Sequence, residues 1–399
     1  MLITQDAAVT PLAGLRGFRA SKVPDRGREG WLCQEPTERS YWMMKLERLV
    51  DFPPIPGNPR NSEGSFLPLK DGRTLFVYSH FTQGADDDAA AALWALTLDA
   101  QGVPGQPHEI IPSGEDGAMN LMSLTLMRMQ DGDVGMFYLR RIGQTLLEMV
   151  LRRSKDEGQS WSAPTPVTTR PGFFVVNNDR VIRLRNGNIL VPAAEHKKMQ
   201  RADGSVYFDT RAEAVFFLSE DDGHTFTEMP GKGVHPYPNK CASGMQEPGV
   251  MEMQDGRLWS WARTDLGAQW EMFSFDGGRR WTPPEPSRFT SPLSPLSVLR
   301  LRDGRLLAVY NPIPLYNGRN IEVRGGWNGG RTPLSVRLSA DDGLTWTAPE
   351  AIEDEGDHGY CYTALMEEDT GTILLAYCAG GAEDGSCLSR LRLSRLTLA

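Results

Sequence analysis

One pattern of apolar and polar residues recurs six times along the chain: an apolar segment, a polar turn with Gly, and a second apolar segment. LKDGRTLFVYS (69–79) and LRDGRLLAVYN (301–311) are clear copies, and the others cover 129–139, 184–194, 253–263 and 367–377. Asp-Gly or Asn-Gly between apolar runs favours a hairpin with a type I′ turn, in which both central residues have positive φ. The pattern therefore predicts six β-hairpins, with turn glycines at Gly72, Gly132, Gly187, Gly256, Gly304 and Gly371.

A second motif, Ser-x-Asp-x-Gly-x-Thr-Trp, alternates with the hairpins. Four copies, some with one substituted position, begin at Ser154, Ser219, Ser274 and Ser339. The Ser and Asp side chains are expected to hydrogen-bond the nearby backbone, the Gly to adopt a positive φ, and the aromatic residue to cover the sheet edge. Each copy therefore predicts a self-stabilised turn between two strands.

Together the two motifs predict the architecture. A hairpin and a strand pair joined by the second motif make a four-stranded antiparallel sheet, and the turn glycines recur every 48 to 69 residues, which suits one blade of a propeller. We therefore expect an all-β fold, a six-bladed β-propeller, over residues 41–399, preceded by an irregular N-terminal arm over residues 1–40. Strands within 41–50 and 389–399 are expected to close the ring.

Composition limits the classes of function. With 40% hydrophobic and 23% charged residues the chain can form a core, and a net charge of −9 without a basic block argues against a nucleic-acid partner. No apolar run is long enough to span a membrane, and the first 20 residues lack the features of a secretory signal, which favours a cytoplasmic location. Five cysteines without a CxxC pair favour reduced thiols, and six histidines without metal-ligand spacing predict neither a metal nor another cofactor. A homo-oligomer stays open.

The repeat also predicts which side chains meet at the centre. Residues at equal distance from the turn glycine should occupy equivalent positions around the axis, at one face of the molecule. The ninth residue before each glycine is, in order, Glu63, Ser123, Asn178, Glu247, Pro295 and Tyr362. The seventh or eighth residue after it is His80, Arg140, Glu195, Arg263 or Asn311.

With these motifs in view, the chain resembles the sialidase (neuraminidase) superfamily over residues 45–399, and the Ser-x-Asp turns resemble its Asp boxes. The most specific stretches are QEPGVMEMQDGRLWSWARTD (246–265) and GRTPLSVRLSADDGLTW (330–346), which look like the strands bearing the family's glutamate and its second and third arginines. The resemblance implies a retaining exo-glycosidase that acts on a terminal sialic acid of a glycoconjugate.

The same resemblance implies a clamp of three arginines for the carboxylate of the substrate, which suits the planar fork of guanidinium. Arg263 and Arg331 match the family pattern. Arg60 is the best match for the first position, although PRNSEGS around it departs from the family's Arg-Ile-Pro, and Arg319 or Arg324 are alternatives.

By the same resemblance, Tyr362 would be the nucleophile and Glu247 the carboxylate that draws off its proton. Tyr360 is the alternative nucleophile, since it lies two residues away and would share a strand face. Asp86 in the loop HFTQGADDDAAA (80–91) would be the acid/base, with Asp87 next and Glu63 as another candidate.

Three further residues near the predicted centre, Asn178, Arg180 and His196, are expected to contact the rest of the sugar, with hydrogen bonding between blades as the alternative. Two other functions remain open at this point. The chain would be a propeller glycosidase for a different acidic sugar, such as a uronic acid or a rhamnose-capped uronide, or a non-catalytic glycan-binding propeller.

Overall fold

The fold is all-β, as the sequence predicts. The computed structural model describes residues 44–314 and 329–398, which belong to the larger of two units of the chain, Met43–Ala399. The predicted arm, 1–40, lies outside these residues. The described helical segments are two short 3-10 turns, η1 (Glu115–Gly117) and η2 (Ala382–Asp384). None of the described helices has the length and hydropathy needed to cross a membrane.

Four sheets contain four antiparallel strands each, in agreement with the prediction for four of the repeats. Three of them follow the chain order. They are β2 (Arg60–Pro68), β3 (Thr74–Phe81), β4 (Ala91–Leu98) and β5 (His108–Ile111); β17 (Gln246–Glu252), β18 (Leu258–Arg263), β19 (Ala268–Ser274) and β20 (Glu285–Thr290); and β21 (Ser297–Arg300), β22 (Leu306–Tyr310), β23 (Leu334–Ser339) and β24 (Glu350–Glu353).

The fourth sheet joins the two ends of the larger unit. Its strand order is β1 (Lys45–Phe52), β27 (Leu391–Thr397), β26 (Ile373–Cys378) and β25 (Cys361–Glu367), so the first described strand pairs with the last. The sequence predicts this pairing from the segments 41–50 and 389–399. The N-terminal strand thereby completes the C-terminal sheet.

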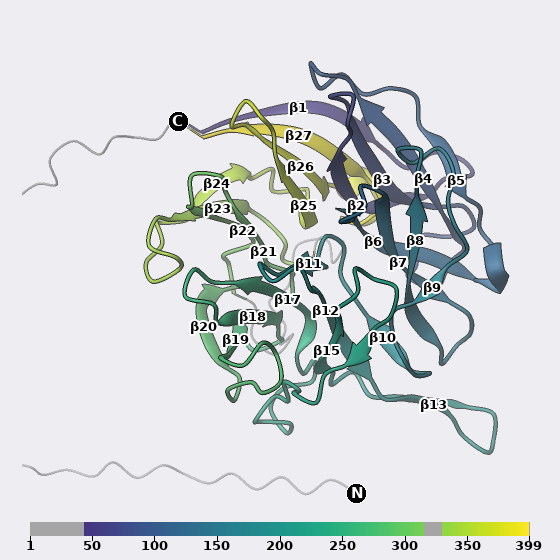
Figure 1. Cartoon of the computed structure of the whole chain (residues 1–399), viewed down its shortest axis with the longest axis vertical. Coiled ribbons are helices and arrows are strands. Elements are labelled where there is room, and N and C mark those ends of the chain that lie inside the picture. Colours follow the sequence, from purple (N-terminus) through teal and green to yellow (C-terminus); the bar gives the residue numbers. More distant parts are fainter. Residues whose placement is uncertain (1–43, 315–328, 399) are drawn as a thin grey trace, which may run out of the picture. The chain divides into compact units, whose positions relative to one another are not determined.

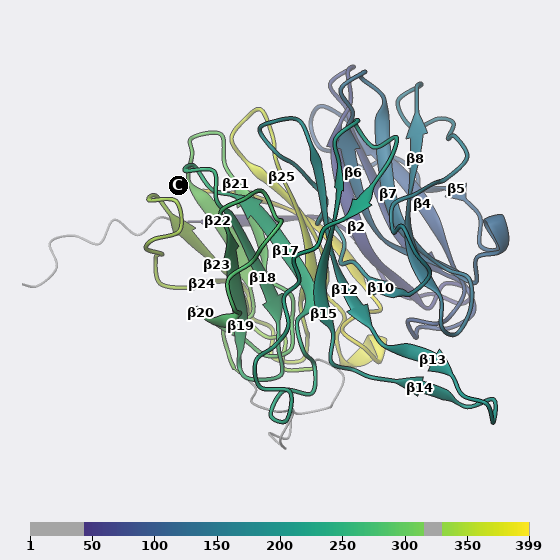
Figure 2. The ribbon, with the colours of Figure 1, turned by 60° about the horizontal axis from the view of Figure 1, so that its bottom comes forward.

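The two remaining repeats differ from the prediction, because they form one nine-stranded sheet. A single parallel pairing, between Phe173 and Leu147, joins the strands of the two repeats. One side has β6 (Asn120–Arg128), β7 (Val134–Arg141), β8 (Leu147–Ser154) and β9 (Thr165–Pro166); the other has β10 (Phe173–Val175), β11 (Ile182–Arg183), β12 (Ile189–His196), β15 (Glu213–Ser219) and β16 (Thr227–Glu228). A separate hairpin, β13 (Lys198–Gln200) and β14 (Val206–Phe208), extends beyond the sheets (Figure 2).

The six predicted hairpins are all present, and each turn glycine has a φ between 81° and 94°. The predicted type I′ geometry is wrong, because the residue before each glycine does not have a positive φ. The polar side chain of that residue stabilises the turn instead: in the first hairpin Asp71 Oδ1 accepts a hydrogen bond from the backbone N–H of Arg73 at 3.1 Å. Asp and Asn suit this turn because their short side chains reach the backbone two residues on.

The Ser-x-Asp turns follow the third strand of their repeats and are held by their own side chains. In the turn after β15, Ser219 Oγ donates to Asp221 Oδ1 (2.8 Å) and accepts from the N–H of Gly223 (2.7 Å). Asp221 also accepts from the N–H and the hydroxyl of Thr225, at 2.9 and 2.6 Å. These bonds fix the chain direction between the third and fourth strands without help from another sheet.

Six hydrophobic clusters lie between successive groups of strands. Val77 and Val150 belong to the cluster between the β2–β5 sheet and β6–β8, and Leu374 and Leu96 belong to the cluster between the β25–β27 strands and the β2–β5 sheet. The other four clusters join the remaining neighbours in the same way. In Figure 1 the first strands β2, β6, β17, β21 and β25 face a common centre, with β1, β5, β20 and β24 at the periphery.

Candidate active site

Four of the inner strands share one irregularity, a bulge at which one residue has a left-handed backbone. These residues are Glu63 (φ 57°), Ser123 (54°), Glu247 (47°) and Tyr362 (56°), in β2, β6, β17 and β25. A bulge redirects the side chain of the extra residue, and a positive φ is strained for any residue other than Gly. The four side chains line one cavity of about 340 Å³. We call this cavity the candidate site.

These four residues are the ones that counting back from the turn glycines selects. At the other two positions, Asn178 and Pro295, the residue that the count selects does not line the cavity. Asn178 is one residue from Asp179, which has the left-handed backbone (φ 58°) in its repeat. The repeat therefore predicts the centre of the site for four of six strands.

Tyr362 lies among charged groups from two other strands. Arg263 Nη1 donates to the Tyr362 hydroxyl at 3.2 Å, and Arg263 Nη2 donates to Glu247 Oε1 at 2.8 Å. The Tyr362 hydroxyl lies 3.5 Å from the same Glu247 oxygen. Burial raises the pKa of Tyr362 far above its ordinary value, although Arg263 opposes the shift. The phenol is therefore protonated at neutral pH and has a carboxylate within reach.

Some buried polar atoms around Tyr362 have no hydrogen-bond partner among residues 44–314 and 329–398. They are Glu247 Oε2, Arg263 Nε and Arg331 Nε. The guanidinium carbons of Arg263 and Arg331 lie 5.8 and 5.3 Å from the centre of the Tyr362 ring. Because buried polar groups are nearly always paired in folded proteins, these atoms indicate a place that a polar ligand would fill.

Arg60 is fully enclosed beside this group, with 1% of its surface exposed. It donates to Glu63 Oε1 at 3.0 Å and to Asp87 Oδ1 at 2.6 Å, and its guanidinium stacks on Phe81 at 4.4 Å. Desolvation opposes ionisation of Asp87, but Arg60, Arg263 and Arg331 together lower the pKa of Asp87. Of the three arginines, Arg60 contacts Asp87 directly, and Arg263 lines the candidate site, whereas Arg60 and Arg331 do not line it.

The structure corrects the position of Asp86. Asp86 is exposed and does not line the candidate site, whereas Asp87 and Asp88 do. The loop turns at Asp86, whose carbonyl accepts the N–H of Ala89 at 2.9 Å, and the next side chain is the one that meets Arg60. Sequence alone could not orient three consecutive aspartates.

The other three predicted sugar contacts have different fates. His196 lines the candidate site, and burial lowers the pKa of its ring. Asn178 does not line it; its amide donates to the carbonyls of Gly64 (2.8 Å) and Tyr362 (3.2 Å), which is the alternative of hydrogen bonding between strands. Arg180 lines a separate cavity and not the candidate site, so its contact with the sugar stays a prediction.

The alternatives to the predicted nucleophile and clamp lie elsewhere. Tyr360 is buried against Tyr377, with ring centroids 6.2 Å apart, and does not line the candidate site. It does not share a face with Tyr362 because the bulge at Tyr362 breaks the alternation of side chains. Cys361 accepts a hydrogen bond from Arg331 at 3.1 Å, and burial raises the pKa of its thiol to about 12. Arg319 and Arg324 lie outside the described residues.

Sequence reasoning missed one wall of the candidate site. The ring centroids of Phe173 and Phe208 lie 5.9 Å apart. The ammonium nitrogen of Lys198 lies 4.2 Å from the Phe173 centroid and 5.1 Å from the Phe208 centroid. Lys198 and Phe208 come from the β13–β14 hairpin, and Arg141 lines the same cavity. Counting nine residues forward from Gly132 and Gly187 gives Arg141 and His196, so the repeat held a signal for these two.

One group of side chains among the described residues has the spacing of metal ligands, and it lies outside the candidate site. Glu355, Asp357 and His358 bring one ligand atom each within 4.8 Å of one another. Glu355 already pairs with Arg48 at 2.7 Å. No residue of this group lines the candidate site.

Glu63 provides a test of the electrostatics of the site. Burial raises the pKa of Glu63 from 4.5 to about 7, despite the opposing charge of Arg60. Between these two pH values the folded chain holds a proton that the unfolded chain has lost, so the stability conferred by Glu63 should fall as pH rises through this interval. At about 1.4 kcal/mol per pKa unit, the stability of the wild type relative to Glu63→Gln should fall by up to roughly 3.5 kcal/mol.

Chemical unfolding of both proteins at several pH values measures this difference. No carboxyl titrates at this position in Glu63→Gln, and its changed hydrogen bonds with Arg60 and Ser123 give an offset that does not vary with pH, so only the pH-dependent part counts. Parallel stability curves for the two proteins would mean that Glu63 ionises normally.

Comparison with known proteins fits this geometry. The BNR repeat-like domain family matches residues 81–375. Anhydrosialidase of Macrobdella decora is 26% identical over 250 residues, 57% of this chain and 29% of the relative. Sialidase of Bacteroides fragilis is 25% identical over 246 residues, 57% of this chain and 39% of the relative. The solved leech intramolecular trans-sialidase, complexed with 2,7-anhydro-Neu5Ac, has a TM-score of 0.65 at 14% identity and covers 88% of this chain and 70% of that one.

The all-β fold and these similarities define a protein of the sialidase/BNR-repeat superfamily, as the sequence motifs predict. The match spans most of the chain, and the chain belongs to the BNR repeat-like domain family. It spans less than half the length of either curated relative.

Proposed function

We propose that this chain is a sialidase-like exo-glycosidase that removes a terminal sialic acid, or a closely related acidic sugar, from a glycoconjugate. The observation that carries the proposal is the contact of Tyr362 with Arg263 and Glu247 inside the candidate site. The family of the chain and the curated relatives support a glycoside hydrolase.

The proposal includes the six-bladed propeller. The nine-stranded sheet would be two blades that touch through the pair Phe173–Leu147. Six hydrophobic clusters between successive strand groups and the pairing of β1 with β27 support a closed ring. Such a ring brings loops that are distant in sequence to one mouth.

The carboxylate of the sugar would bind between Arg263 and Arg331, close to Arg60. Guanidinium donates two parallel hydrogen bonds to a carboxylate, and the unpartnered Nε atoms of Arg263 and Arg331 support this use. Asp87 already experiences the charge of all three arginines, so the site attracts carboxylates.

The Tyr362 oxygen would attack the anomeric carbon as its proton passes to Glu247, and water would later release the sugar with retention of configuration. A phenol is a weak nucleophile until a base takes its proton. A neutral attacking group avoids repulsion by the carboxylate of the substrate, and sialidases are known exceptions to the two-carboxylate scheme. The positive charge that develops on the sugar in the transition state would be stabilised by the negative charge that the Tyr362 oxygen gains as its proton passes to Glu247.

The proton for the leaving oxygen would come from Asp87 rather than Asp86. Asp87 is exposed at the mouth, where the leaving group departs, whereas Glu63 is 2% exposed and bonded to Arg60. A substrate carboxylate that binds Arg60 would compete with Asp87 for the Arg60 guanidinium. Because the bond with Arg60 lowers the pKa of Asp87, weakening this bond would raise that pKa and favour protonation of Asp87.

Asp87→Asn should therefore slow the release of poor leaving groups far more than that of good ones. An acid that protonates the leaving oxygen contributes roughly 10²–10⁴-fold, but a nitrophenolate needs little protonation. Comparing kcat for an alkyl and a nitrophenyl glycoside in Asp87→Asn and in the control Asp86→Asn measures the effect. An equal loss on both substrates, or a larger loss in Glu63→Gln, would reassign the acid to Glu63.

Fluorophore release from an α-sialoside by the purified chain tests the function itself. Activity supports the proposal, and activity on uronides alone would support the second candidate, a glycosidase for another acidic sugar. That candidate is favoured by two extra cations in the site, Arg141 and Lys198. Saturable binding of sialic acid without turnover of any glycoside would indicate a glycan-binding protein.

A further inference from the structure

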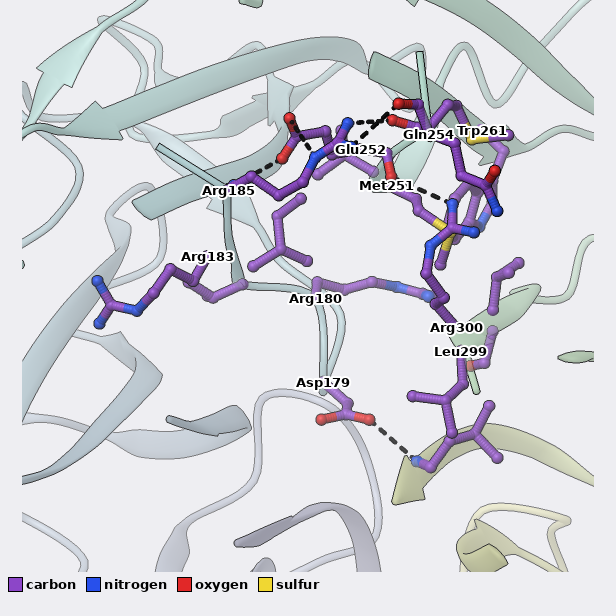
Figure 3. Close-up of a pocket in the computed structure, with 17 residues that line it drawn as sticks. Asp179, Arg180, Arg183, Arg185, Met251, Glu252, Gln254, Trp261, Leu299 and Arg300 are labelled. Atoms are coloured by element: carbon purple, nitrogen blue, oxygen red, sulfur yellow. Dashed lines mark hydrogen bonds and ion pairs between the residues drawn. The ribbon is translucent and has the colours of Figure 1, made fainter. Parts of the chain in front are cut away.

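A second cavity, of about 430 Å³, lies farther along the same inner strands and shares no lining residue with the candidate site. Its walls come from the segment 179–185 and from β17, β21 and β25 (Figure 3). On β17 the candidate site is lined by Gln246 and Glu247, and this cavity by residues 250–252. We call it the Arg180 cavity.

The arginines at its margin are neutralised by ion pairs. Arg183 pairs with Asp222 at 2.7 Å, Arg185 with Glu252 at 3.0 Å, and Arg300 with Asp342 at 2.6 Å. In Figure 3, Arg183 points away from the cavity and Arg185 meets Glu252 at its edge. These three side chains therefore have carboxylate partners already.

Arg180 differs from them. It extends across the cavity in Figure 3, is 4% exposed, and forms no ion pair within the part of the chain that the structure describes. Its Nη2 donates to the carbonyl of Leu296 at 2.7 Å, and its Nε has no hydrogen-bond partner among the described residues. A buried guanidinium with an unfilled donor is unfavourable unless an acceptor joins it.

The nearest carboxylates do not fill this role. Both oxygens of Asp179 are used, one by the Ser65 hydroxyl and one by the N–H of Leu365, each at 3.0 Å. Glu247 bonds Arg263 instead. Burial lowers the pKa of Arg180 to about 10, although the charges of Glu247 and Asp179 oppose the shift. Arg180 is therefore still a cation at neutral pH.

Apolar side chains of Val181, Val250, Trp261, Leu299 and Leu365 also line the cavity, and the centroid of the Trp261 ring lies 5.9 Å from the guanidinium carbon of Arg180. We propose that the Arg180 cavity binds a small monocarboxylate, whose carboxylate accepts hydrogen bonds from Arg180 and whose short alkyl chain packs on these apolar side chains. An inorganic anion would satisfy Arg180 but leave the apolar walls without contacts. The proposal does not depend on the glycosidase function.

Calorimetric titration of the intact chain with sodium butyrate tests the proposal, with butyramide and sodium chloride as controls. Butyrate should bind saturably. Butyramide, which has the same shape without the charge, should bind at least tenfold more weakly, and chloride should not compete at matched ionic strength. The absence of saturable butyrate binding, or equal binding of butyramide, would overturn the proposal.

Variants locate the binding. Arg180→Met should weaken butyrate at least tenfold, whereas Arg185→Met, at the edge and paired with Glu252, should not. Leu299→Trp fills the cavity while Arg180 keeps its charge, and it should also abolish binding, which keeps the test valid if Arg180→Met does not fold. Arg263→Lys should leave butyrate binding unchanged, because that variant alters only the candidate site. Butyrate binding that disappears in Arg263→Lys and persists in Leu299→Trp would place the anion in the candidate site instead.

Discussion

Tyr362→Phe should abolish turnover of the sialoside while the melting temperature stays within a few degrees of the wild type. The change removes only the hydroxyl that meets Arg263 and Glu247, at 3.2 and 3.5 Å. The ring keeps its packing and its position between the guanidinium groups of Arg263 and Arg331. Loss of a nucleophile that cannot be replaced by another side chain lowers kcat by at least about a thousandfold.

Tyr360→Phe is the matched control for this variant. It deletes a hydroxyl from the same segment, and that hydroxyl is buried without a hydrogen-bond partner outside the candidate site. Its kcat should therefore equal that of the wild type, with unchanged or slightly higher stability. A Tyr362→Phe protein that retains normal turnover, or a Tyr360→Phe protein that loses it, would remove Tyr362 from the mechanism.

Arg263→Lys should lower kcat/KM by roughly a hundredfold, because one ammonium cannot bond Tyr362, Glu247 and a substrate carboxylate together. Hydrogen bonds to charged groups contribute about 1.5–3 kcal/mol each, and Arg263 makes two of them in the free protein. Arg257→Lys is the control, since Arg257 lies in the turn of the same hairpin and pairs with Asp255 at 3.3 Å. Steady-state kinetics of the wild type, Arg263→Lys and Arg257→Lys give the kcat/KM of each variant relative to the wild type.

A substrate analogue separates the clamp from general damage. The wild type should bind a sialoside carboxamide much more weakly than the carboxylate, and Arg263→Lys should reduce this preference. If the variant loses activity but keeps the full preference for the carboxylate, Arg263 positions Tyr362 and Glu247 and does not hold the substrate.

The strands of the site could be predicted from sequence because they follow the repeat. The turn glycine fixes the register of each hairpin, and the bulge recurs at the same distance from it, so Glu63, Ser123, Glu247 and Tyr362 meet in one cavity. The count fails by one residue at Asn178, because the left-handed residue of that repeat is Asp179.

The loops of the site could not be predicted in this way, because a loop has no period. Only the turn at Asp86 decides that Asp87 contacts Arg60. Lys198 and Phe208 belong to the separate β13–β14 hairpin between β12 and β15. Arg180 follows a predicted position by two residues, yet the chain direction after Asp179 takes it into the second cavity.

The pairing of β1 with β27 has a consequence for biosynthesis. Seven register pairs join residues 45–52 to residues 391–397, so during translation β1 has no partner in this sheet until residues 391–397 have been synthesised. Until then β1 presents an exposed edge that can pair with another chain. A chain that lacks residues 391–397 would thus leave β1 unpaired, and such molecules are prone to exchange strands with each other.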